Sequence, residues 1–279
     1  MPAAYLPDRA LIQLSGADAE HFLHNLVTTD IAALPEREAY PGALLTPQGK
    51  ILFDFLVWRD GAGFVIETDA AQRDALIKRL TMYKLRAAVD IVPGESDGMT
   101  VGWGAEADAD GVVDHRFAVA AVRVLRKPGK ATDDGRQGYD ALRVLSGIVE
   151  AGPDYPLQDP FPHDVLYDHM GGVSFKKGCY VGQEVVSRMQ HRGTARRRVV
   201  TVTADAALPA PGSELSAGGK PIGTLGTVTG NRGLAIVRID RAGEAMASGT
   251  PILAGDGAVL LSLPFWSGLS FPTSAAEEG

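Results

Sequence analysis

The 279-residue sequence has a single cysteine, Cys179, and no apolar run that approaches the length of a membrane span. One cysteine cannot form an internal disulfide, so the fold does not depend on an oxidising compartment. The N-terminal residues show no basic region followed by an apolar core, so no signal peptide is evident. We therefore expect a cytoplasmic protein with no membrane partner.

Negative charge exceeds positive charge in the chain as a whole, and positive charge is concentrated in one segment. The formal net charge is −7, which argues against general nucleic-acid binding. Residues 176–198 are the exception, because they carry seven lysines and arginines against one glutamate. This segment is a candidate anion site, and a solvated surface is the other open interpretation. A carboxylate-rich ligand, a phosphate backbone or an acidic partner would each suit it.

The stretch Lys176–Glu184 concentrates unusual chemistry around the cysteine. Gly178 and Gly182 indicate backbone turns or the close approach of a ligand. The two lysines of the stretch and Arg188 favour the thiolate, the form of cysteine that is nucleophilic and binds metals. A lone cysteine can also be a small buried apolar group. The residues alone leave both interpretations open.

The segment Lys177–Glu184, followed by Arg188 and the basic run Arg192–Arg198, closely resembles the signature of the YgfZ family of folate-binding proteins. Those proteins are relatives of the mitochondrial iron–sulfur assembly factor Iba57, and both resemble the glycine-cleavage aminomethyltransferase GcvT. Three further segments also resemble the family: residues 22–31, 43–51 and 171–175. The C-terminal part of the chain matches only loosely.

The resemblance implies a tetrahydrofolate-binding accessory factor for iron–sulfur cluster assembly and for the maturation of iron–sulfur enzymes, including tRNA-modifying ones. It makes Cys179 the reactive thiol. The residues expected to support the thiol are Lys177, Tyr180, Gln183, Glu184 and Arg188. The residues expected to contact folate are Asp54, Lys177, Arg196 and Arg198.

One cysteine cannot hold an iron–sulfur cluster by itself, since these clusters usually need about four protein ligands. Cys179 is therefore expected to bind metal only as a ligand shared with a partner, through a transient cluster. The resemblance implies that this partner is an A-type iron–sulfur carrier or a client iron–sulfur enzyme. No direct nucleic-acid partner is expected.

Two alternative functions stay open. The transferase has adjacent aspartates where this chain reads Phe53-Asp54, and a pterin-contacting glutamate where this chain has Leu145. Loss of a carboxylate removes a proton acceptor or charge stabiliser, so we expect an assembly factor rather than an enzyme. A folate-dependent, aminomethyltransferase-like one-carbon enzyme remains the first alternative. A tRNA-binding module, suggested by the basic segment, is the second.

The residue pattern predicts an α+β protein. After residue 198, short strands separated by glycine, proline and asparagine turns are typical of a small antiparallel barrel. The family resemblance adds that residues 1–197 form a GcvT-like region of two interlocked α+β lobes around a folate cavity. Residues 198–279 would then be the C-terminal β-barrel domain.

Local patterns predict several elements of the first region. Ser15 is expected to cap a helix whose apolar positions include Phe22 and Leu26. A hairpin is predicted from residues 52–58 to residues 64–67, through a glycine-containing turn. The other expected elements are helices at 71–83 and 139–145 and strands at 87–92, 99–103 and 117–125.

Overall fold

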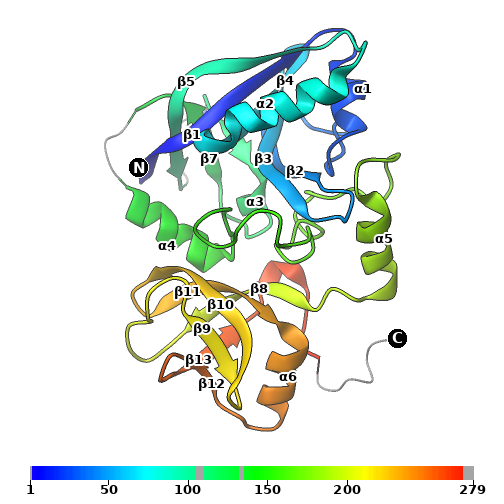
Figure 1. Ribbon diagram of the computed structural model, residues 1–279. Helices are drawn as coiled ribbons and strands as arrows, with labels where there is room; N and C mark the ends of the chain where they lie inside the picture. The colour runs from blue at the N-terminus through cyan, green and yellow to red at the C-terminus, as the bar shows by residue number, and fades with distance from the viewer. Residues whose placement is uncertain (1, 105–109, 132–134, 273–279) are drawn as a thin grey trace. The chain divides into compact units, whose positions relative to one another are not determined.

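The computed structural model describes residues 2–104, 110–131 and 135–272 (Figure 1). Packing divides the chain into two compact units. The first unit consists of Met1–Tyr139 and Tyr167–Gln183, and the second of Asp140–Leu166 and Glu184–Gly279. Each unit contains a closed β-barrel. Within the described residues, no helix combines the length and the apolar character that crossing a membrane requires.

The barrel of the first unit has the strand order β1-β4-β3-β2-β6-β7-β5. Its strands are β1 (Ala3–Ser15), β2 (Glu38–Leu45), β3 (Ile51–Asp60), β4 (Gly63–Asp69), β5 (Asp90–Trp103), β6 (Val112–Asp114) and β7 (Val124–Pro128). Strands β2 and β6 run parallel, and the other paired strands are antiparallel.

Three helices belong wholly to the first unit: α1 (Ala19–His24), α2 (Ala70–Lys84) and α3 (His115–Ala118). Helix α2 packs against β1, β4 and β5 (Figure 1). Its buried residues Leu76 and Leu80 join a core that also contains Phe22 of α1 and Val57 of β3. Alternation along β3 places one set of side chains in this core and the other set, including Trp58, in a second cluster.

A network of buried charges lies inside the first unit. Arg126 of β7 donates to Glu67 of β4 through Nε at 2.7 Å and to Asp114 of β6 through Nη1 at 3.2 Å. Arg116 of α3 donates to the same aspartate at 2.7 Å. Burial alone would raise the pKa of Glu67, but the guanidiniums of Arg126 and Arg9 lower it below its ordinary value. The network therefore ties three strands and α3 together with ionised groups.

The barrel of the second unit has the strand order β10-β11-β8-β13-β12-β9. Its strands are β8 (Arg197–Thr203), β9 (Glu214–Ala217), β10 (Lys220–Thr229), β11 (Arg232–Arg238), β12 (Ile252–Ala254) and β13 (Gly257–Ser262). Helix α6 (Ile239–Ala247) packs against β9 to β12, and a 3-10 turn follows at Phe265–Ser267. The apolar side chains of the strands form the core of this barrel.

Two helices begin in the first unit and continue into the second: α4 (Arg136–Ser146) and α5 (Gln183–Arg192). The buried Arg143 of α4 donates to Asp140 at 2.8 Å, to Asp154 at 2.7 Å and to Thr227 of β10 at 2.9 Å. Asp154 in turn accepts the backbone N–H of Thr227 at 2.6 Å. These bonds explain why residues 140–166 pack with the second barrel.

The α+β class and the C-terminal antiparallel barrel are confirmed. The strand predicted at 117–125 is wrong: α3 ends at Ala118, and β7 begins only at Val124. Ser15 ends β1 instead of capping a helix, and Asp18 holds the N-cap position of α1. The predicted domain boundary at 197 stays a prediction. Packing places residues 140–166 and 184–197 in the same compact unit as the C-terminal barrel.

We expect Arg126→Met to lower the free energy of unfolding by about 3–5 kcal/mol, because Glu67 and Asp114 would be left buried without their shared cation. Urea denaturation of the folded variant measures this loss. Lys127→Met is the matched control, since this neighbouring side chain is exposed and lies 3.9 Å from Asp110. The control should change stability by no more than about 0.5 kcal/mol. Equal effects of the two substitutions would contradict the account.

Candidate functional site

The cysteine lies in an irregular loop that ends where α5 begins at Gln183. Gly182 closes this loop with a φ of +80°, in the left-handed region that favours glycine. A Cβ atom at this position would lie 2.6 Å from the carbonyl oxygen of Thr46, in the turn that follows β2. The backbone turn predicted at Gly182 is therefore confirmed, and the close approach seen there is to the main chain of Thr46. Gly178 has open space around its Cα and makes no such approach.

Lys177 anchors the loop to the end of α1. Its ammonium donates to the main-chain carbonyls of Val27 at 2.6 Å, Thr29 at 2.9 Å and His24, the last residue of α1. Carbonyls at the end of a helix lack partners within the helix, and lysine side chains satisfy them well. The side chain is 9% exposed, and burial lowers the pKa of Lys177 to about 8.

Tyr180 is the second buried residue of the loop. Its ring centroid lies 5.2 Å from the ammonium of Lys177, a cation–π arrangement. The hydroxyl is buried and has no hydrogen-bond partner among the described residues. Burial raises the pKa of Tyr180 to about 12, so the phenol is neutral at physiological pH.

Cys179 lies between these two anchors and is exposed. The structure therefore decides against the interpretation of this residue as a small buried apolar group. The thiol is accessible to a reagent or to a partner protein. Among the described residues, it makes no hydrogen bond or ion pair. Its reactivity stays a prediction.

The remaining residues predicted to support the thiol lie on α5. Gln183 donates through Nε2 to the carbonyl of Gly178 at 3.4 Å, a long bond that spans the tip of the loop. Glu184 and Arg188 form an exposed ion pair one helical turn apart. Gln183 thus braces the loop directly. Glu184 and Arg188 belong to the second unit and pair with each other.

The four predicted folate contacts are not brought together within one unit. Asp54 of β3 lies in the first unit and accepts a bond from the Tyr167 hydroxyl at 3.4 Å. Arg196 and Arg198 lie in the second, where Arg198 donates to the carbonyl of His163 at 2.5 Å. The three N–H donors of Lys177 face three carbonyls, which leaves none for a folate carboxylate. We derive no chemical step through folate from this arrangement.

Fewer cations of the basic segment 176–198 are available to bind an anion than its net charge predicts. Lys177 and Arg198 are buried. Arg197 donates to Asp159 at 2.7 Å, and Arg188 is paired with Glu184. Lys176, Arg192 and Arg196 are exposed. Internal pairing and burial therefore take up more than half of the cations that the sequence concentrates here.

A cavity of about 390 Å³ adjoins the loop within the first unit. Its lining residues are Thr29, Asp30, Ala33, Leu34, Tyr40, Gly171, Val173, Ser174, Phe175 and Lys176. The ring of Tyr40 stacks on that of His115, with centroids 3.8 Å apart. This volume is within the range of small-ligand pockets. None of the four predicted folate contacts lines it, and the sequence offered no motif at Tyr40 that would have indicated it.

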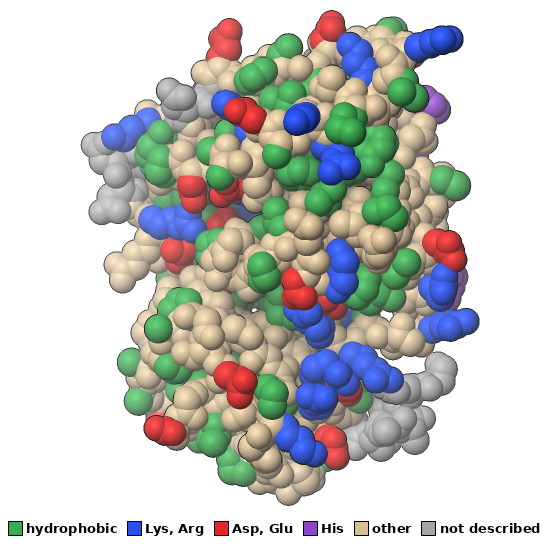
Figure 2. All heavy atoms as spheres, viewed as in Figure 1, with side chains coloured by type: hydrophobic (Ala, Val, Ile, Leu, Met, Phe, Trp, Pro, Cys, Tyr) green, Lys and Arg blue, Asp and Glu red, His purple; other side chains and the backbone are tan. Residues whose placement is uncertain are grey.

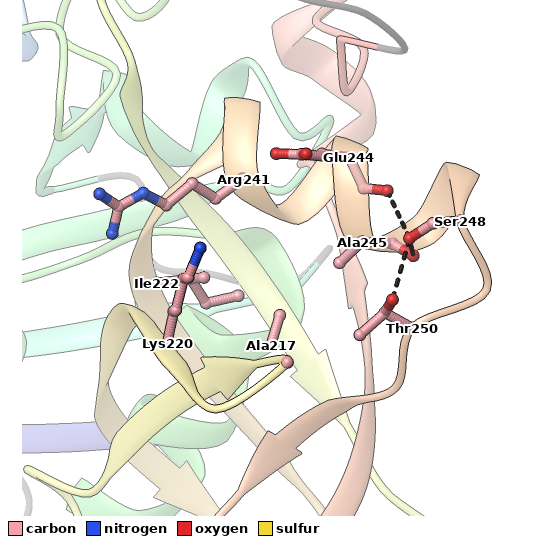
Figure 3. Close-up of a pocket in the computed structure, with 9 residues that line it drawn as sticks. Ala217, Lys220, Ile222, Arg241, Glu244, Ala245, Ser248 and Thr250 are labelled. Atoms are coloured by element: carbon pink, nitrogen blue, oxygen red, sulfur yellow. Dashed lines mark hydrogen bonds between the residues drawn. The ribbon is translucent and has the colours of Figure 1, made fainter.

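A second hollow, of about 260 Å³, lies on the barrel of the second unit (Figure 3). Lys220 and Arg241 lie on one side of it, and Ser248 and Thr250, hydrogen-bonded at 2.9 Å, lie on the other. Lys and Arg side chains gather over this barrel near α6 (Figure 2).

Within residues 2–104, 110–131 and 135–272, no group of three or more His, Cys, Asp or Glu side chains could hold a metal ion.

Comparisons with known proteins agree with this architecture. A family model for the C-terminal beta-barrel domain of CAF17 matches residues 196–269. The aminomethyltransferase of the glycine cleavage system from Bartonella henselae superposes with a TM-score of 0.68, covering 97% of this chain and 87% of that one. Its sequence identity is 17%, so this likeness shows the fold alone. The predicted GcvT-like fold is confirmed.

The relatives found by sequence carry a consistent name. The mitochondrial iron-sulfur cluster assembly factor IBA57 of Homo sapiens is 30% identical over 302 residues, covering 94% of this chain and 84% of that protein. The IBA57 homolog of Phaeosphaeria nodorum is 31% identical over 288 residues, covering 85% of this chain and 70% of that protein. Of several other fungal homologs with this name, the chain spans 55–56% of the length.

The predicted cytoplasmic location is contradicted, because these relatives are named as mitochondrial proteins. The prediction rested on the single cysteine and on the lack of an apolar span. A fold without an internal disulfide is compatible with any reducing compartment, and the lack of an apolar span does not identify which one.

The lowered pKa of Lys177 predicts a pH dependence with a definite sign. Between about pH 8 and the ordinary lysine pKa, the unfolded chain binds a proton that the folded protein has released. Stability should therefore rise with pH in this window, by up to about 1.4 kcal/mol per pH unit. Urea denaturation of wild type and Lys177→Met across the window isolates this contribution as the difference in slope. Identical slopes would show that Lys177 titrates normally.

Proposed function

We propose a function on one premise: the chain belongs to the IBA57 family, whose relatives described above are iron–sulfur cluster assembly factors. On this premise, the chain acts in the assembly of iron–sulfur clusters. The observation that carries the proposal is the exposed Cys179, held between the buried side chains of Lys177 and Tyr180. An accessible thiol on an anchored loop suits a residue that must meet a partner protein.

The ligand count limits what the thiol can do. A cluster usually needs about four ligands, and this chain supplies one cysteine. Cys179 would therefore act as one ligand of a cluster that a partner also binds. In such an exchange, one iron–thiolate bond of the partner breaks as the bond to Cys179 forms, and the Cys179 thiol gives up its proton to water or buffer.

The partner in this proposal is an A-type iron–sulfur carrier or a client iron–sulfur enzyme. The support is the name of the relatives together with the single accessible ligand. Gln183 would keep the tip of the loop in shape through its bond to Gly178. Glu184 and Arg188, exposed on α5, would present one negative and one positive charge to the partner.

Tetrahydrofolate or a derivative is the ligand that we propose for this fold. The support is the GcvT-like architecture and the carboxylate of Asp54 in the first unit. A carboxylate can accept hydrogen bonds from the N–H groups of a pterin ring. No chemical step is assigned to the folate.

An aminomethyltransferase activity is not proposed. The likeness to that enzyme shows the fold alone, and Leu145, at the place of its glutamate, is 59% exposed. A tRNA-binding role is not proposed either, because Lys177, Arg197 and Arg198 of the basic segment are engaged within the protein.

The proposal predicts that Cys179→Ser folds and yet fails to support maturation of iron–sulfur enzymes in cells. Serine keeps the shape of the side chain and removes the polarizable thiolate that binds iron. The measurement is the activity of iron–sulfur enzymes in a deletion strain that carries the wild type or the variant at matched protein levels. Thermal denaturation of both purified proteins serves as the folding control. Full rescue of enzyme activity by the Cys179→Ser variant would contradict the proposal.

The folate proposal has a separate test. Tetrahydrofolate at about 100 times its Kd should stabilise the protein by about 2.7 kcal/mol, which appears as a raised Tm. Asp54→Asn removes the charge of the proposed pterin contact and should reduce this shift, while Asp74→Asn on the exposed surface of α2 should leave it intact. The absence of any shift with the wild type at saturating ligand would remove folate from the account.

A further inference from the structure

We propose that Lys177 is a positioning residue, whose ammonium fills a cation site made by the main-chain carbonyls of the last residue of α1 and of two residues just after it, and thereby fixes the Cys179 loop. The inference deepens the proposed function, because that function gives the held thiol its use. The charge of the sequence stretch predicts a different role for this lysine, namely stabilisation of the thiolate.

The carbonyl oxygens of His24, Val27 and Thr29 converge on one point. The distances from Nζ are 2.6 Å to Val27 and 2.9 Å to Thr29, and the bond to His24 completes the set. A lysine ammonium has three N–H donors and no acceptor, so the number of donors equals the number of carbonyls. The site is built to hold an N–H cation.

The groups around the ammonium do not explain its burial by themselves. Asp30 acts on it through space and raises its pKa, whereas burial acts more strongly in the opposite direction. Burial lowers the pKa of His24, and the charge of the Lys177 ammonium lowers it further. The Tyr180 ring covers the ammonium. An ammonium without a directly bonded carboxylate is costly to bury unless its donors are satisfied. The three carbonyls satisfy them.

The anchor determines where the thiol lies. Lys177 bonds to residues 148–153 positions earlier in the chain, so the tie joins two distant segments of the first unit. Tyr180 is the next buried residue of the loop, which leaves only Gly178 and Cys179 exposed between the two anchors. A two-residue tip between fixed points has little freedom to move. Loss of the anchor should release it.

The single cysteine allows a direct test of this freedom. A nitroxide spin label on Cys179 reports the motion of the loop without any engineered site. We expect a restricted spectrum for the wild type and for Lys176→Ala, which truncates the exposed neighbouring lysine. Lys177→Ala should lose the restricted component. Propylammonium, which replaces the atoms removed by the substitution, should restore it.

Tetramethylammonium at the same ionic strength is the control, since it is a cation without N–H donors. Restoration by propylammonium alone supports the proposal. The proposal is overturned if Lys177→Ala keeps the wild-type spectrum, or if both cations restore the restricted component equally. Should Lys177→Ala fail to fold, Lys177→Met keeps most of the side-chain volume and lacks the donors. An unchanged spectrum for labelled Lys177→Met would then contradict the proposal, and a mobile one would support it.

The test is independent of the proposed function. Rescue of a deletion strain by Cys179→Ser would remove the role in cluster assembly and leave the spectroscopic result intact. Conversely, an unchanged spectrum in the Lys177 variants would leave the role of the thiol standing and remove only the anchor.

Discussion

Burial of the Lys177 ammonium against three carbonyls is the interaction on which the site depends. Desolvation of an unpaired charge opposes folding, so such a lysine persists only where enough acceptors converge. One acceptor is the carbonyl of His24, the last residue of α1, where a helix leaves carbonyls without partners, and the other two are those of Val27 and Thr29 in the segment that follows. Helix termination at one place in the chain thus supplies the anchor for a loop about 150 residues later.

The same principle recurs in the body of each unit. Arg126 is buried between two carboxylates inside the first barrel, and Arg143 joins Asp140, Asp154 and Thr227 in the second. Such networks contribute less to net stability than the distances alone would imply, because desolvation offsets the attraction. They hold particular segments in register, since any other arrangement would leave a buried charge unpaired. In the second unit, this constraint fastens residues 140–154 to β10.

Sequence patterns predicted the class of the fold and the C-terminal barrel because strand alternation and turn residues are local signals. They failed at 117–125, where α3 and β7 share a stretch of mixed apolar residues that suits either element. The motif around Cys179 was found from its composition. The use of Lys177 could not be predicted, since the carbonyls that it binds belong to the backbone and leave no mark on the sequence. The composition of the chain also could not predict the compartment in which the protein is located.

The central claim is that Cys179 contributes one ligand to a cluster shared with a partner. Anaerobic reconstitution of an A-type carrier with iron and sulfide, in the presence of wild type or Cys179→Ser, tests it most directly. Absorption and Mössbauer spectra of the isolated complex report the iron ligands. The account predicts a cluster spectrum for the wild-type complex that differs from that of the carrier alone and is absent with Cys179→Ser. The same spectrum with both proteins, or a stable cluster on the wild-type monomer alone, would contradict it.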